Sequence, residues 1–277
     1  GTTTDRHTPV QVSGLNLSTS APTPTISWII TDVDSDNNSE IDGGNTSIAL
    51  DKYGNAHISY YNSSNVMYAT NASGFWVTST VHRGNDDGHH RGYTSIALDK
   101  FGNAHISYNS NSSWRNSALK YATNASGKWV KKTVDSKGGT YISIALDKSG
   151  NAHISYYNRG HVKYATNASG EWIKKTVNSD KDSGEGGYTS IALDKSGNAH
   201  ISYCFNGSYG LTYELKYATN ASGSWAITPV DGYSCWDTSI ALDKSDNAHI
   251  SYYDDDTSDL KYATNASGSW VTTTVDS

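Results

Sequence analysis

The stretch Ser143-Ile-Ala-Leu-Asp-Lys-Ser-Gly-Asn-Ala-His-Ile-Ser-Tyr156 decides the fold, because it occurs five times along the chain with changes only at its seventh and eighth positions. Its copies begin at Ser47, Ser95, Ser143, Ser190 and Ser239. The last copy has Asp246 where the other four have glycine. A second motif, Tyr-Ala-Thr-Asn-Ala-Ser-Gly-x-Trp, follows each copy and starts at Tyr68, Tyr121, Tyr164, Tyr217 and Tyr262. A period of 47 to 49 residues indicates a repeat architecture.

Each repeat predicts four short β-strands. In the third copy these are residues 143–146, 152–156, 162–166 and the run led by Trp172, with turn residues between them. No helical pattern separates the strands, so parallel βαβ units are excluded. A four-stranded antiparallel sheet at this period is typical of a propeller blade. We therefore predict an all-β fold, a five-bladed β-propeller over residues 26–277, with blades starting near residues 47, 95, 143, 190 and 239.

The composition of the 277 residues agrees with this fold and excludes some partners. Tyr (20) far outnumbers Phe (3) and Met (1), and aromatic and β-branched residues favour strands. The formal net charge of -6 gives no basic footprint for nucleic acid. No apolar run is long enough to span a membrane. We expect neither nucleic-acid binding nor membrane insertion.

The two repeated motifs resemble those of secreted tandem-repeat β-propellers from bacteria and archaea, whose blades are nearly identical. The resemblance covers residues 26–277 and implies an extracellular, non-catalytic repeat protein. A more distant resemblance, to the Asp-box blades of sialidases, rests on one aspartate at the first turn of each blade: Asp51, Asp99, Asp147, Asp194 and Asp243. The Ser or Thr expected two residues before that aspartate is Ala in this chain.

The chain has one outer strand more than five blades need. Six Trp-led runs begin at Trp28, Trp76, Trp129, Trp172, Trp225 and Trp270. One interpretation places residues 26–33 as a fifth strand on a blade edge or as an ordered tail. The other is that this strand, with residues 1–25 as an N-terminal extension, pairs with the sheet edge of a second copy. Such head-to-tail contact that does not close generates a filament.

Aromatic residues recur in the loops that vary between repeats. These residues are Tyr93, Tyr141, Tyr188, Tyr233 and Trp236. Loops on a rigid scaffold carry binding residues, and exposed aromatic rings stack on sugars, so the five are candidate glycan-binding residues. The alternative is that they only cover the ring of blades.

Two other sets of side chains suggest metal binding. One histidine recurs per blade, and because whole blades separate the five, we expect structural roles for them. Asp32, Asp34 and Asp36 place oxygen ligands at alternate positions, as at the start of a calcium loop. The glycine and glutamate of an EF-hand are absent (Asn37 and Gly43 stand there), so the choice lies between a looser calcium site and a solvated acidic turn. No other cofactor is expected.

Catalytic motifs are hard to find. The five arginines are scattered over the N-terminal extension and the loops, so they form no triad like that of sialidases. No nucleophile elbow, phosphate loop or zinc helix motif occurs. We therefore predict that the protein is not an enzyme, with a glycosidase as a distant third possibility.

The cysteines and the N-glycosylation sequons indicate the cellular compartment of the protein. Cys204 and Cys235 both flank the variable loops of the fourth repeat, and we expect a disulfide, rather than two free thiols, in an oxidising compartment. Each blade carries one Asn-Ala-Ser sequon, at Asn71, Asn124, Asn167, Asn220 and Asn265. These asparagines are candidates for N-linked glycans; the alternative is that the turn itself needs an asparagine at this position. We expect a secreted or cell-surface protein.

The leading functional hypothesis is an extracellular structural or adhesion subunit. It would bind copies of itself head-to-tail through its N-terminal strand, in a fibre or surface layer, and carry N-linked glycans. The alternative is a multivalent lectin that uses the aromatic loop residues.

Overall fold

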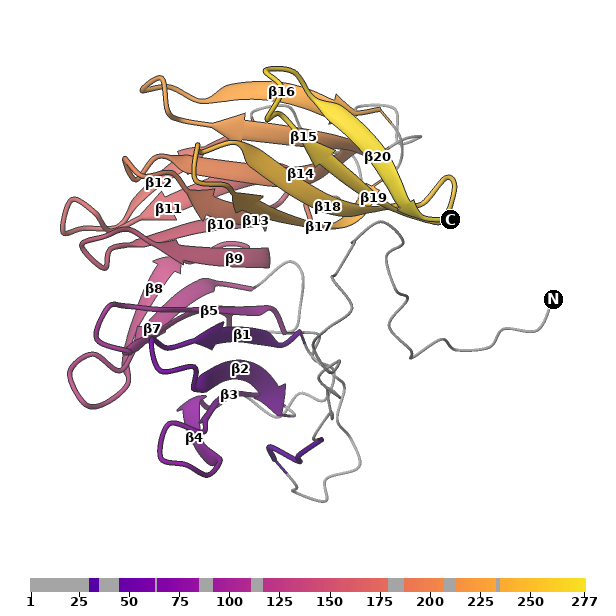
Figure 1. Ribbon diagram of the computed structural model, residues 1–277. Helices are drawn as coiled ribbons and strands as arrows, with labels where there is room; N and C mark the ends of the chain where they lie inside the picture. Colours follow the sequence, from indigo (N-terminus) through magenta and orange to yellow (C-terminus); the bar gives the residue numbers. More distant parts are fainter. Residues whose placement is uncertain are drawn as a thin grey trace. The chain divides into compact units, whose positions relative to one another are not determined.

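The computed structural model describes residues 30–34, 45–62, 64–84, 92–110, 117–178, 187–206, 213–232 and 235–277. Residues 33–277 belong to one compact unit. Its described part contains five four-stranded antiparallel sheets and no helix, and each sheet is built from four consecutive strands (Figure 1). The prediction of an all-β fold with five four-stranded propeller blades is confirmed.

Strand order within each sheet follows the chain, from an inner to an outer edge. The first strands are β1 (Ser47–Leu50), β5 (Thr94–Leu98), β9 (Thr140–Leu146), β13 (Ser190–Leu193) and β17 (Cys235–Leu242). The second strands are β2 (Ala56–Asn62), β6 (Ala104–Asn109), β10 (Ala152–Asn158), β14 (Ala199–Asn206) and β18 (Ala248–Asp254). Successive first strands contact one another, so they are the innermost strands.

The remaining strands lie toward the rim. The third strands are β3 (Asn65–Thr70), β7 (Leu119–Thr123), β11 (His161–Thr166), β15 (Tyr213–Thr219) and β19 (Asp259–Thr264). The outer strands are β4 (Val77–His82), β8 (Val130–Asp135), β12 (Ile173–Thr176), β16 (Ala226–Asp231) and β20 (Val271–Asp276). We call β1–β4 blade 1, and blades 2 to 5 follow in chain order.

The Asp-x-x-Gly-Asn motif forms the turn between the first and second strands. In blade 3, Asp147 Oδ1 accepts hydrogen bonds from the backbone N–H groups of Ser149 and Asn151 at 2.9 and 2.8 Å. Asp147 Oδ2 accepts a third bond, from Asn151 Nδ2, at 2.8 Å. Gly150 has a φ of 85°, a left-handed conformation that glycine adopts without steric cost. The turn therefore needs Asp and Asn at fixed spacing and, between them, a residue that tolerates a left-handed backbone, which accounts for the near-constancy of the motif.

Neighbouring blades are joined by a backbone hydrogen bond and a ring contact. Ser143 Oγ in blade 3 accepts a bond from the backbone N–H of Ile191 in blade 4 at 3.2 Å. The rings of Tyr164 and Trp225 meet edge-on with 5.3 Å between centroids. The same tyrosine–tryptophan contact recurs between the other successive blades, in the pairs Tyr68–Trp129, Tyr121–Trp172 and Tyr217–Trp270. The invariant Tyr and Trp of the second motif are thus the residues that hold blades together.

The hydrophobic core is divided between blades. Four clusters of buried residues lie between blades 1 and 2, 2 and 3, 3 and 4, and 4 and 5. Each contains isoleucines and tyrosines from the first three strands of two neighbouring blades. Among the described residues no such cluster joins blade 5 to blade 1. The described blades therefore form a series with two unpaired faces.

The expected N-terminal strand, residues 26–33, falls mostly outside the described residues. Its described part, residues 30–33, is not in a strand. Asp34 follows it, and its Oδ2 accepts bonds from Tyr60 Oη at 2.6 Å and Asn62 Nδ2 at 3.2 Å. Residues 1–25, the expected extension, also lie outside the described residues, so the donor-strand hypothesis stays a prediction.

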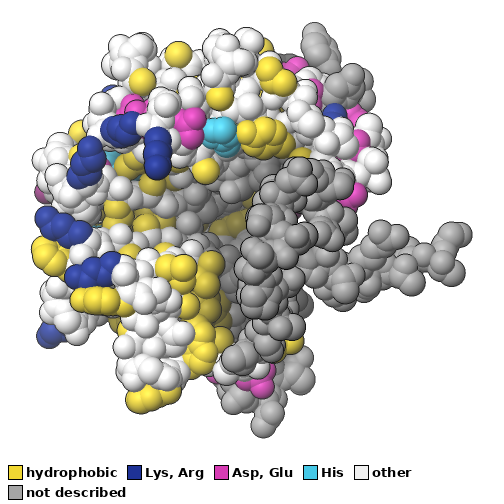
Figure 2. All heavy atoms as spheres, viewed as in Figure 1, with side chains coloured by type: hydrophobic (Ala, Val, Ile, Leu, Met, Phe, Trp, Pro, Cys, Tyr) yellow, Lys and Arg dark blue, Asp and Glu magenta, His cyan; other side chains and the backbone are white. Residues whose placement is uncertain are grey.

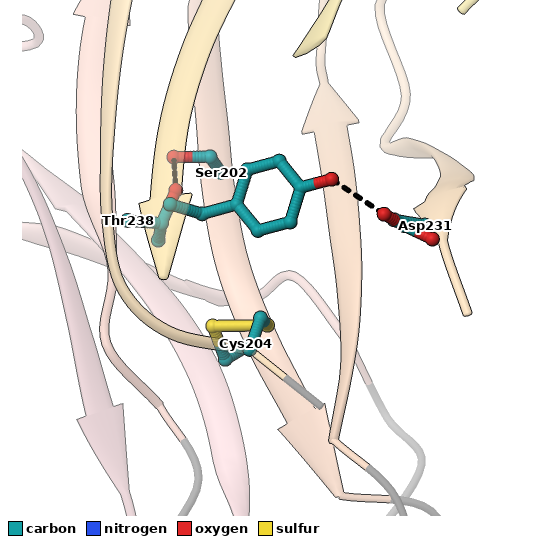
Figure 3. Close-up of a disulfide and its surroundings, with 6 residues drawn as sticks. Ser202, Cys204, Asp231 and Thr238 are labelled. Carbon is teal, nitrogen blue, oxygen red and sulfur yellow. Dashed lines mark hydrogen bonds between the residues drawn. A yellow bond between two sulfur atoms is a disulfide. The ribbon is translucent and has the colours of Figure 1, made fainter. Parts of the chain in front are cut away.

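The predicted disulfide between Cys204 and Cys235 is confirmed. It joins β14 of blade 4 to β17 of blade 5, and both cysteines are fully buried. Figure 3 shows two hydrogen bonds close to the disulfide. Thr238 Oγ1 donates to Ser202 Oγ at 2.8 Å, and Tyr252 Oη donates to Asp231 Oδ2. In the part of the chain that the structure describes, no helix has the length and apolar character to cross a membrane.

The repeated tyrosine–tryptophan contact predicts unequal costs for equivalent tryptophans. Trp225 and Trp76 stand at the same position of their repeats and are both half-buried, but among the described residues no ring contact involves Trp76. W225A should therefore lower the free energy of unfolding by about 1 kcal/mol more than W76A, the value of an edge-to-face pair. Guanidinium unfolding of both variants measures this difference, and equal losses would contradict the structural role of the ring contact.

Candidate functional site

The antiparallel blades place two kinds of connection on opposite sides. The Asp-x-x-Gly-Asn and Asn-Ala-Ser-Gly turns share one side, which we call the turn face; it lies to the left in Figure 1. The loops that vary between repeats share the other side, which we call the loop face. In Figure 2, Lys side chains gather along the left of the view, on the turn face.

A cavity of about 650 Å³ opens on the turn face between blades 3, 4 and 5. Its apolar lining is Ala168 and the last residue of each first strand, Leu146, Leu193 and Leu242. Its charged lining consists of four carboxylates and two ammonium groups, those of Asp147, Asp194, Asp243, Asp246, Lys148 and Lys195. This volume is in the range of small-ligand sites.

Three of the four carboxylates also hold their own turns. Asp243 accepts bonds from the N–H groups of Ser245 and Asn247 at 2.7 and 2.9 Å and from Asn247 Nδ2 at 2.9 Å. The side-chain bond from Asn247 contributes most to lowering the pKa of Asp243 to about 2. Asp147 and Asp194 likewise have pKa values below the ordinary value because of such bonds, against the opposing effect of burial. All three are therefore anionic acceptors at neutral pH.

Lysines link the three turns around the cavity. Lys148 Nζ in blade 3 donates to the carbonyl oxygen of Lys195 in blade 4 at 2.6 Å. Lys195 Nζ in turn donates to the carbonyl oxygen of Lys244 in blade 5. These contacts hold three turns in a fixed relation, which provides a preformed site.

Asp246 distinguishes the cavity from the rest of the repeats. It stands where the other four copies have glycine, and it keeps their left-handed backbone, with a φ of 65°. A non-glycine residue in this region costs about 1–2 kcal/mol, less for Asp than for most others. Its Oδ1 accepts a 3.4 Å bond from the backbone N–H of Lys195. A strained residue at a cavity is a recognised sign of function, and this one adds a carboxylate that the repeat does not need.

The recurring histidines form the same contact with a tyrosine in every blade, buried in blades 1 to 4 and half-buried in blade 5. In blade 3, His153 Nδ1 lies 2.5 Å from Tyr164 Oη, and its Nε2 lies 3.6 Å from Asp147 Oδ2. The carboxylate favours a proton on Nε2, so Nδ1 accepts from the tyrosine. Burial lowers the pKa of His105, His153 and His200, and the aspartates only partly oppose it. The histidines thus have a structural role, as expected from the sequence, but their partners lie within the same blade and not, as we also expected, between blades.

The turn face differs in blades 1 and 2. The variable residue of Asp-Lys-x-Gly-Asn is Tyr53 or Phe101 there, both 77% exposed, and serine in blades 3 to 5. Lys52 and Lys100 lie over these rings at 4.9 and 5.2 Å. From the sequence we expected binding residues only on the loop face, and the turn face was missed. The signal was the third position of Asp-Lys-x-Gly-Asn, which is aromatic in two repeats and serine in three.

The structure brings four of the five predicted aromatic residues together on the loop face. Tyr93 and Tyr141 have ring centroids 4.7 Å apart, Tyr141 and Tyr188 4.3 Å, and Tyr188 and Trp236 5.4 Å. Tyr141 is buried in the core between blades 3 and 4, whereas Trp236 is 36% exposed. Tyr233 lies outside the described residues. The row thus joins blades 2 to 5 by ring contacts and includes Trp236, whose side chain is partly exposed.

The remaining candidate residues are placed as follows. Asp34 bonds to Tyr60 and Asn62, and Asp36 lies outside the described residues. Within the described ranges no group of three or more His, Cys, Asp or Glu side chains is placed to hold a metal ion. The calcium site stays a prediction.

The sequon asparagines have a structural use. Asn167 Oδ1 accepts a 2.7 Å bond from the backbone N–H of Ala152, which ties the Asn-Ala-Ser-Gly turn to the second strand. The other four sequon asparagines make the same bond. Because the turn itself needs this asparagine, glycosylation at these positions stays a prediction.

Comparison with known proteins finds similarity of fold. No family model and no curated protein matches the chain. Among solved structures it is similar to a PL25 ulvan lyase bound to a GlcA–Rha3S saccharide (TM-score 0.59, 15% identity, 80% of this chain and 69% of the lyase). It is also similar to the SapL1 lectin in complex with α-methyl fucoside (TM-score 0.55, 14% identity, 84% and 81%). A third match is the NanB sialidase of Streptococcus pneumoniae (TM-score 0.54, 11% identity, 84% and 61%).

These matches correct one prediction. We predicted that the protein is not an enzyme, but the chain shares its fold with a lyase and a sialidase as well as a lectin. Absence of a known catalytic motif was a poor ground for that exclusion, because propeller enzymes collect their residues from several blades that are far apart in sequence. The resemblance to propellers holds at the level of fold. The likeness of the aspartate turns to Asp-box blades stays a prediction.

The buried histidines predict loss of stability in mild acid. Their pKa lies below the ordinary 6.5 in the folded protein, so the unfolded chain binds more protons as pH falls below 6.5. Melting temperature should therefore be constant above pH 7 and decline from pH 6.5 downward. A second decline should begin below pH 3.8, when carboxylates such as Asp147 are protonated. Calorimetry from pH 8 to 3 measures both declines.

A variant separates the histidine contribution. Gln at positions 105, 153 and 200 can still bond to the tyrosine hydroxyl but does not titrate. The triple variant should show a shallower decline between pH 6.5 and 5 than the parent protein. An unchanged slope would show that other groups cause the acid sensitivity.

Proposed function

We propose that this propeller is a saccharide-binding protein whose site is the cavity on the turn face between blades 3, 4 and 5. One observation carries the proposal: a preformed cavity of about 650 Å³ holds an acidic side chain, Asp246, that the fold does not require. Apolar residues from three blades and fixed polar groups surround it, which is the usual composition of a small-molecule site.

The chemistry of the lining favours a neutral sugar. Carboxylate oxygens accept bonds from hydroxyl groups, and the ammonium groups of Lys148 and Lys195 donate to them. The three leucines offer an apolar surface for the C–H groups of a pyranose. Four carboxylates against two ammonium groups give the site an excess of negative charge, which opposes uronates and sulfated sugars.

The proteins of similar fold support a carbohydrate ligand, but they include both a lectin and enzymes, so they do not decide whether the ligand is only bound or also cleaved. The matched lectin has α-methyl fucoside bound, and the matched lyase has a saccharide bound. Each binding experiment on this protein should therefore include a measurement of new reducing ends and of unsaturated products, which reports turnover.

The exposed ring of Trp236 supports a second binding position, on the loop face. The exposed part of this ring can stack on a sugar ring while Tyr188, 5.4 Å away between centroids, helps to hold the tryptophan in place. W236A tests this position, because it should weaken binding there and leave binding in the cavity unchanged.

We also propose that the protein acts outside the cell. The disulfide between Cys204 and Cys235 supports this, because such bonds persist in oxidising compartments. Extracellular polysaccharides or surface glycans are then the available ligands.

Substitutions at Asp246 test the cavity. D246N keeps a residue that tolerates the left-handed backbone but removes the charge, and it should weaken sugar binding about 10-fold or more, the value of one charge-assisted hydrogen bond. D246G restores the repeat consensus, so it should lose binding and raise the free energy of unfolding by about 1 kcal/mol. A glycan array with neutral, uronate and sulfated sugars finds the ligand, and calorimetric titration measures affinity.

Gly54→Asp in blade 1 is the matched control. It places the same side chain at the same turn position, away from the cavity, and nothing lies within 4 Å of the added Cβ. It should destabilise the protein and leave the affinity unchanged. A D246N variant that binds as tightly as the parent would refute the cavity as the site.

A further inference from the structure

The unpaired face of blade 1 and the unpaired face of blade 5 correspond to the two sides of the contact that repeats between neighbouring blades. In the four interfaces within the chain, the front of one blade packs against the rear of the next, and the isoleucine at the second position of Ser-Ile-Ala-Leu is 5–8% exposed. The rear face of blade 1, which has no described blade before it, leaves the same residue, Ile48, 63% exposed and Leu50 64% exposed. Figure 2 shows hydrophobic side chains gathered where β1 and β2 lie in Figure 1.

The front face of blade 5 shows the complementary pattern. The serine of Ala-His-Ile-Ser-Tyr is fully buried in blades 1 to 4 (Ser59, Ser107, Ser155 and Ser202), whereas Ser251 is exposed. Tyr253 is 38% exposed, and Ser239 and Ala241 are exposed as well. These groups match those that receive the next blade elsewhere in the chain: Ser190 Oγ, for example, accepts a bond from the N–H of Ile240.

The polar rim of the rear face of blade 1 is already satisfied. In blade 3, Tyr156 Oη and Asn158 Nδ2 donate to Asp135 at the end of the preceding outer strand, at 3.0 and 3.2 Å. In blade 1 the equivalent Tyr60 and Asn62 donate to Asp34. What remains uncovered is the apolar inner part around Ile48 and Leu50, and burying such surface gives roughly 25 cal/mol per Å².

We propose that a second copy of this chain occupies these faces, with the front face of blade 5 of one copy packed against the rear face of blade 1 of the next. The contact between blades forms four times within the chain, and blades 1 and 5 each expose one of its two sides. The contact joins unlike faces, so it is heterologous and adds copies head-to-tail. Each blade turns the series further around the same axis. The five blades of a second copy would therefore collide with those of the first unless the second copy is also shifted along that axis. We expect an open helical filament.

The first test is self-association of the full chain. Sedimentation velocity between 0.1 and 100 µM should show mass that increases with concentration, and negative-stain images should show filaments. L50R places a charge beside Ile48 on the exposed apolar part of the rear face and should weaken association at least 10-fold. Ile227→Arg, at a 41% exposed position on the outer strand β16, is the matched control and should associate like the parent protein. A protein that stays monomeric at 100 µM would overturn the proposal.

Cross-linking tests the orientation. One sample carries Ile48→Cys and the other carries Ser239→Cys, and the two native cysteines are both in the disulfide. A short bis-maleimide should give covalent dimers of one chain of each kind when the samples are mixed, and none between chains of the same kind. Dimers within one sample would overturn the head-to-tail contact. A double variant that cross-links within a monomer would overturn it too, because the faces would then close on each other. Sugar binding by L50R should equal that of the parent protein, so failure here is distinguishable from failure of the proposed cavity.

Discussion

The contact between neighbouring blades is the constraint on which the rest of the structure depends. A four-stranded sheet of this length has two faces and no core of its own, so each blade is stable only where it covers another. The serine–backbone bond and the tyrosine–tryptophan pair set the spacing of that contact. The small cores, the cavity shared by three blades and the two unpaired faces all follow from the repetition of this one interface.

The repeat made the scaffold predictable, because each motif residue has a local reason. Asp147 and Gly150 form a turn of fixed geometry. The polar residues of Ala-His-Ile-Ser-Tyr are buried because they have partners there, as Ser155 has in Thr189 and His153 in Tyr164. The structural role of the histidines followed from their spacing, one to a blade. The disulfide was predicted from the position of both cysteines in one repeat, and the structure contains it.

The candidate site was less predictable, because it depends on which turns become neighbours around the axis. Asp246 was visible as a departure from the repeat, but its place beside Lys195 and the leucines of other blades was not. Tyr53 and Phe101 were overlooked because the motif around them hardly changes. The aromatic loop residues were predicted one by one, but not their contacts with each other. These contacts bury Tyr141 and leave Trp236 partly exposed, and they depend on how successive blades are placed around the axis.

The single disulfide acquires a further meaning in a chain of near-identical blades. Since the contact surfaces of all blades are alike, a blade can settle against the wrong neighbour during folding, the usual failure of repeat proteins. Cys204 and Cys235 exist in one copy each and join one particular pair, blades 4 and 5. Oxidation thus marks one arrangement of the blades as correct. If a blade has been skipped or exchanged between blades 4 and 5, the two cysteines do not meet and the disulfide cannot form.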